Sequence, residues 1–140
     1  MAIQMTLGEV LEAEVALTRL AAMPWPVRTG YHISKLLRLL RVETQLFEQQ
    51  RIAAVREFGT PRPATDEERA RGNGEEITQV PPARMTEYLR KVTELQQLPI
   101  TIDWAPLTIE AFGDQRLTGI DMLALGPLVM NGAGEGAQHG

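Results

Sequence analysis

The chain contains no cysteine, and this absence excludes several kinds of site at once. Disulfide frameworks, thiolate nucleophiles and zinc sites with cysteine ligands cannot form. Its only histidines, His32 and His139, are too far apart in the sequence to make a metal site by themselves. Ser34 is the only serine, and no nucleophile elbow surrounds it. We therefore expect no enzyme activity, no metal and no cofactor.

Aromatic residues are sparse at 5%, so aliphatic side chains must fill most of the core. No segment approaches the roughly 20 apolar residues needed to span a bilayer, and the N-terminus lacks the pattern of a secretion signal. The net charge of −4 disfavours non-specific nucleic-acid binding. At 140 residues, we expect one soluble domain over residues 1–130 and a flexible, glycine-rich tail over residues 131–140.

Helical patterns dominate the first half of the chain. Thr6 and Glu9 have capping-box spacing at the start of a helix over residues 6–23. Pro24 and Pro26 end that helix and hold Trp25 in an extended corner. One long helix then runs to residue 58, before Gly59.

The long helix carries apolar residues on two faces. At 100° per residue, a first stripe contains Ile33, Leu36, Leu37, Leu40, Thr44, Phe47, Ala54, Val55 and Phe58. A second stripe, on nearly the opposite face, contains Leu39, Val42, Leu46 and Ala53. Two stripes imply cover on both sides, either by the first and third helices within the fold or by another subunit or partner.

The second half of the chain mixes short elements. We expect residues 60–82 to be a polar surface loop, either mobile or ordered only by a partner. It should contain a helical turn over 66–71, a tight turn at 72–74 and a short strand over 77–80. A third helix over residues 82–98 should pack antiparallel to the second. Alternation predicts a strand at 100–104. Residues 107–112 form either a further strand, which the alternation favours, or a helical turn, and a short helix follows from residue 118. The predicted fold class is α+β, mainly α: a helical hairpin built on one long central helix, with a short strand or hairpin.

Two groups of side chains are candidates for contact with other molecules. The interface candidates are Trp25, Leu39, Val42 and Leu46. Trp25 is interpreted either as an exposed anchor or as a plug that seals the corner between helices. A basic cluster, which we define as Arg28, Lys35, Arg38 and Arg41, is spread over a broad arc of the long helix. A solvated face is favoured for it over contact with phosphate or an acidic partner.

Residues 26–43, the run Phe47-Glu-Gln-Gln-Arg-Ile52 and the ending Glu57-Phe-Gly59 resemble a family of small bacteriophage and prophage proteins of uncharacterised function. The similarity extends from about residue 7 to residue 129. It includes the strand over 98–103 and a final helix over 118–125. The chain differs in having fewer lysines, more alanine and arginine, and the Pro-Trp-Pro corner. The resemblance implies a phage origin and transfers no catalytic residues.

On this basis we expect a non-enzymatic bacteriophage structural or virion-assembly protein. It would act through protein–protein contacts, as a homo-oligomer or with other virion proteins, in the virion or the host cytoplasm. The alternative is a phage-encoded regulator that binds a host protein such as RNA polymerase. A nucleic-acid-binding module that uses the basic cluster is a third possibility. No small-molecule substrate and no membrane partner are expected.

Overall fold

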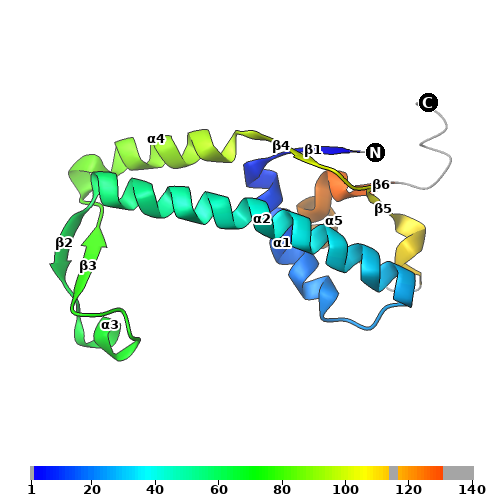
Figure 1. The fold of residues 1–140 in the computed structure, drawn as a ribbon, viewed down its shortest axis with the longest axis horizontal. Helices are drawn as coiled ribbons and strands as arrows, with labels where there is room; N and C mark the ends of the chain where they lie inside the picture. The colour runs from blue at the N-terminus through cyan, green and yellow to red at the C-terminus, as the bar shows by residue number, and fades with distance from the viewer. Residues whose placement is uncertain (1, 114–116, 131–140) are drawn as a thin grey trace. The chain divides into compact units, whose positions relative to one another are not determined.

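The fold is mainly α, as predicted. The computed structural model describes residues 2–113 and 117–130, so the predicted tail at 131–140 lies outside the described residues. The chain divides into two compact units, residues 1–45 with 96–140 and residues 46–95. One long helix, α2 (Val27–Phe58), runs through both units (Figure 1). The single domain over residues 1–130 therefore stays a prediction.

The first unit combines helices with two small sheets. Strand β1 (Ile3–Thr6) pairs antiparallel with β4 (Pro99–Ile102). Strand β5 (Leu107–Thr108) pairs in parallel with β6 (Val129–Met130). The helices are α1 (Leu7–Ala21), the first part of α2 and α5 (Gly119–Leu125), with 3-10 turns η2 (Ile109–Phe112) and η3 (Gly126–Leu128). For residues 107–112, the favoured strand is thus correct only for the first two residues, and the alternative, a helical turn, is correct for the rest.

Helix α1 begins as predicted, at a capping box. The Thr6 hydroxyl accepts from the Glu9 N–H at 3.2 Å, and the Glu9 carboxylate accepts from the Thr6 N–H at 2.8 Å. The core face of α1 consists of Leu7, Val10, Ala13, Ala16, Leu17 and Leu20. Val15 lies off this face and is 62% exposed. The two alanines occupy the buried positions because they allow neighbouring elements to approach closely.

The first stripe of α2 is the buried face of that helix, as predicted. Ile33, Leu36, Leu37, Leu40, Phe47, Ala54 and Phe58 are all buried, while Thr44 and Val55 are half-buried. The stripe supplies core residues to both units, because it extends on either side of residue 45.

The second unit contains the hairpin that replaces the expected loop at residues 60–82. Strands β2 (Thr60–Pro63) and β3 (Glu76–Gln79) pair antiparallel, and helix α3 (Asp66–Ala70) lies at the tip (Figure 1). Three of these elements were predicted: the helical turn over 66–71, the tight turn at 72–74 and the strand over 77–80. Gly72 and Gly74 have φ of 82° and 85°, as the tight turn requires. Regular pairing of residues 60–63 was not predicted.

Two prolines explain why β2 was missed. Pro61 and Pro63 lack an N–H and so argue against a strand in a central position. In this hairpin the Ala64 N–H donates to the Glu75 carbonyl at 2.9 Å. Since N–H directions alternate along a strand, Arg62 faces β3 with its N–H and both prolines face away from it. The prolines therefore cost the pairing nothing, and they block a further strand from adding at this edge.

Helix α4 (Met85–Gln96) lies antiparallel along the second half of α2, as predicted (Figure 1). It follows a 3-10 turn, η1 (Pro82–Arg84), that opens with a proline. Lys91 Nζ is 2.6 Å from a carboxylate oxygen of Glu57. The core of this unit is small: Ala54, Phe58 and Val80 are buried, with Val55 and Tyr88 packed against them. No residue of α4 is fully buried.

Gly59 has little space around its α-carbon. A methyl group there would lie 2.3 Å from the Val55 carbonyl oxygen and 2.8 Å from Thr78 Cγ2. We predict that Gly59→Ala lowers the free energy of unfolding by about 1–3 kcal/mol, the usual cost of overpacking, as measured by chemical denaturation. Gly119→Ala is the matched control, since no atom lies within 4 Å of the added methyl group. Equal stability of both variants would contradict this close approach.

The Glu68 carboxylate at the hairpin tip is held by Arg62, whose two guanidinium nitrogens donate to it at 2.8 and 2.7 Å. This bond, together with the Thr65 N–H, lowers the pKa of Glu68 from 4.5 to about 2. A lowered pKa means that the stabilisation is complete above pH 4.5 and is lost as the pH falls through about 2. We predict that NMR titration of the Glu68 carboxyl carbon gives a midpoint near 2, and that Arg62→Ala returns the pKa toward its ordinary value.

Candidate protein–protein interface on helix α2

The corner before α2 is closed by Trp25. Its indole N–H donates to the Leu20 carbonyl at 2.7 Å, and its ring meets Phe112 edge-on with centroids 5.6 Å apart. The Cβ of Trp25 also approaches Gly30 in the first turns of α2. These are the contacts of a plug between two helices, and part of the ring stays exposed. The use of Trp25 as an interface anchor stays a prediction.

The second stripe of α2 is open. Val42 and Leu46 are each 52% exposed, Ala53 is exposed, and Leu39 is half-buried. Leu39 and Val42 belong to the first unit and Leu46 to the second, but all three follow one another at helical spacing on a continuous helix. The interpretation in which helices of this fold cover both stripes is therefore not what the structure shows. Cover of this stripe by another subunit or a partner stays a prediction.

The basic cluster does not converge on one point. Lys35 Nζ lies 5.0 Å from the centre of the Trp104 ring, a cation–π contact. The Arg41 guanidinium is 3.7 Å from the Glu14 carboxylate of α1. For Arg28 and Arg38, the described part of the chain contains no salt-bridge partner. Two of the four cations are thus engaged inside the first unit, and the choice between a solvated face and contact with phosphate or an acidic partner stays a prediction.

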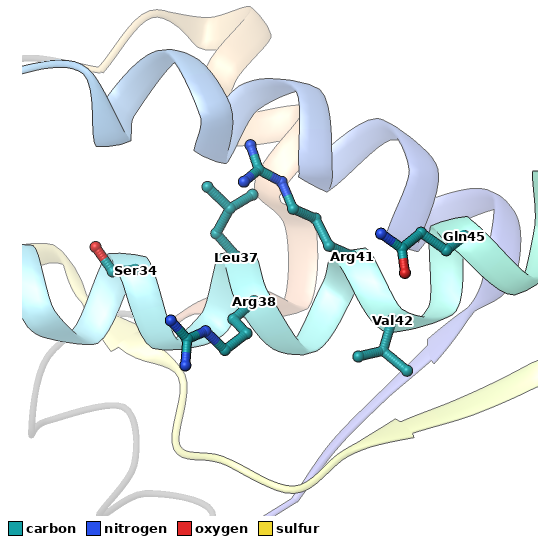
Figure 2. Close-up of a pocket in the computed structure, with 6 residues that line it drawn as sticks. All are labelled: Ser34, Leu37, Arg38, Arg41, Val42 and Gln45. Atoms are coloured by element: carbon teal, nitrogen blue, oxygen red, sulfur yellow. The ribbon is translucent and has the colours of Figure 1, made fainter.

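Three of the predicted contact residues line one shallow groove beside α2. Its lining residues are Ser34, Leu37, Arg38, Arg41, Val42 and Gln45, and its volume is about 440 Å³ (Figure 2). Figure 2 shows Arg41 reaching toward α1 and Arg38 extending to the other side of α2. A hydroxyl, an amide and two guanidinium groups surround apolar side chains here. This mixture suits the edge of a protein interface, where charged and polar groups ring an apolar centre.

Other polar side chains near α2 have partners inside the fold. His32 Nε2 is 2.7 Å from the Ala105 carbonyl oxygen, so this histidine holds a loop against the helix. Arg51, which lies between Phe47 and Ala54 on α2, pairs with Glu48 one turn before it. Hydrogen bonds to Glu48 and then to Tyr88 raise the pKa of Arg51, and Arg51 lowers the pKa of Glu48. The carboxylate of Glu48 thus compensates the positive charge of Arg51 beside the buried residues Phe47 and Ala54.

Within residues 2–113 and 117–130, no group of three or more histidine or acidic side chains is arranged to hold a metal ion. In the same residues, no helix combines the length and the apolar character that crossing a bilayer requires.

Sequence reasoning missed a second exposed apolar surface, formed by α1 and α5. Val15 is 62% exposed, Ile120 75% and Leu123 83%. The sequence did contain a signal for it. Val10, Ala13, Ala16 and Leu17 follow helical spacing and form the core face of α1, and Val15 lies off that face.

Comparison with known proteins gave no relative: no family model, curated protein or solved structure matches this chain. The similarity to phage proteins stays a prediction.

We predict that the two stripes of α2 differ sharply in their effect on stability. Leu40 is fully buried, so Leu40→Ala should lower the free energy of unfolding by about 2–5 kcal/mol. Val42→Ala and Leu46→Ala should change it by no more than about 0.5 kcal/mol, because these side chains are half in water. Chemical denaturation at low protein concentration checks this. A large loss at Val42 or Leu46 would show that the fold itself covers the second stripe.

Proposed function

We propose that this chain is a non-enzymatic bacteriophage protein that acts through protein–protein contacts, as a component of the virion or in its assembly. The observation that carries the proposal is the open second stripe of α2, with Val42 and Leu46 each 52% exposed. Aliphatic side chains in a row on a helix favour cover by another chain. The phage setting is supported by the resemblance of residues 26–59 and 118–125 to phage proteins.

The spacing of the second stripe favours a helix as the partner element. Leu39, Leu46 and Ala53 are seven residues apart, and Val42 lies three residues after Leu39. They occupy the a positions and the first d position of a heptad pattern, which packs side chains of one helix into a facing helix, while the second d position is the polar Gln49. Arg38 and Glu43 border the stripe with opposite charges and can select the register of such a partner.

The stripe is tested by placing charge on it. We predict that Val42→Asp combined with Leu46→Asp folds normally but fails to join phage particles, since two carboxylates cannot be buried at an apolar contact. Mass spectrometry of particles purified from a phage that carries the variant gives the copy number relative to wild type. Thr93→Asp, an exposed position on α4, is the matched control and should be incorporated as wild type.

Absence of the wild-type chain from purified particles and from assembly intermediates would overturn the proposal. Capture of one host protein at equal stoichiometry from a lysate, lost in the Val42→Asp and Leu46→Asp variant, would favour the regulator of a host enzyme. Steeply salt-dependent binding to DNA or RNA would favour the nucleic-acid module and point to Arg28, Lys35, Arg38 and Arg41.

A further inference from the structure

Helix α5 buries Asp121 and Leu125 on one face and leaves two large apolar side chains exposed on the other. Asp121 is buried, and its carboxylate accepts from the Arg19 guanidinium of α1 while its N–H donates to the Thr118 hydroxyl at 3.0 Å. Ile120 and Leu123, one turn apart, are 75% and 83% exposed. The ion pair therefore fixes α5 on α1 with an isoleucine and a leucine facing outward. Aliphatic side chains this exposed beside a buried carboxylate indicate a surface that is covered when the protein is assembled.

The outward face of α5 continues onto α1. Glu12, Val15, Ala16 and Arg19 lie on one face of α1, at spacings of three and four residues. Together with Ile120, Leu123 and Ala124 they line a shallow groove of about 410 Å³. We name this surface the α1–α5 patch. Its centre is apolar, with Val15 62% exposed. Along α1 it ends in an acidic residue, Glu12, on one side and a basic residue, Arg19, on the other.

We propose that the α1–α5 patch is covered by the same patch of a second copy of this chain, related by a two-fold axis. The two ends of the patch carry opposite charges, and a two-fold axis exchanges ends. When two copies of α1 cross antiparallel between positions 15 and 16, Glu12 of one copy faces Arg19 of the other, twice. A surface that is apolar in the middle and of opposite charge at its ends is thus complementary to itself.

Arg19 can serve both contacts. Its side chain remains 57% exposed although it pairs with Asp121, and a guanidinium has five N–H donors. One edge holds α5 in place, and the other is free to meet a carboxylate across the axis. The residue that orients the apolar face of α5 outward would therefore also mark the register of the dimer.

This proposal uses α1 and α5 and does not depend on the function proposed for α2. The first test is the molar mass in solution by light scattering over a concentration series. Wild type should approach twice the mass of one chain. Leu123→Asp should raise the dissociation constant of the dimer by about tenfold or more, as expected for a central anchor. Glu12→Arg should weaken the dimer as well, because two arginines would then face each other at both ends.

The absence of cysteine permits a sharper test of position. Val15→Cys places the only thiol beside the proposed axis, and Val42→Cys places one on the second stripe of α2, at similar exposure. With a mild oxidant, Val15→Cys should form a disulfide-linked dimer rapidly, and the added Leu123→Asp change should abolish it. A wild-type chain that stays monomeric at all concentrations would overturn the proposal. So would cross-linking through Val42→Cys alone, which would support the α2 contact instead.

Discussion

The structure depends on the burial of one apolar stripe along α2. That stripe places Ile33, Leu36 and Leu40 in the core of the first unit, and Ala54 and Phe58 in the core of the second. Most of the stability of a helix in a folded protein comes from such packing of its apolar face and not from intrinsic propensity. Because the buried stripe is set by these contacts, the opposite face of the helix is turned outward. Val42 and Leu46 are exposed because the first stripe, on the other side of the helix, faces the cores.

A second constraint is electrostatic. A carboxylate at the buried position of Asp121 needs a partner, since removing an unpaired charge from water costs several kcal/mol. Arg19 supplies it across 102 residues of sequence. The pair acts together with the buried Leu125, four residues later on the same face of α5, and these two anchors set the direction of the other side chains of this short helix. Ile120 and Leu123 are exposed for this reason, and α1 and α5 share an apolar surface that neither helix would have alone.

The predicted elements and the missed ones differ in how far apart the contacting residues are. The capping box at Thr6, the Pro-Trp-Pro corner, the first stripe of α2 and the turn at Gly72 and Gly74 rest on contacts within a few residues, and they were found. Strand β1 was missed because four residues with alternating burial carry little signal until β4 pairs with them. Strand β2 was missed because its prolines are acceptable only with their outward register. Residues 60–82, predicted as a loop, therefore form a hairpin in the structure.

The cap of α1, the proline corner before α2, the buried stripe of α2 and the mainly α class of the fold follow from the residues alone. Capping, proline geometry and helical periodicity are local and can be read from neighbouring residues. Long-range contacts set which apolar residues remain exposed. They turned Val15 outward, packed Trp25 against Phe112, engaged Lys35 and Arg41 inside the first unit and left Ile120 and Leu123 of α5 at the surface. Whether a side chain is exposed depends on contacts with residues that are distant in the sequence, and a local sequence pattern does not show those contacts.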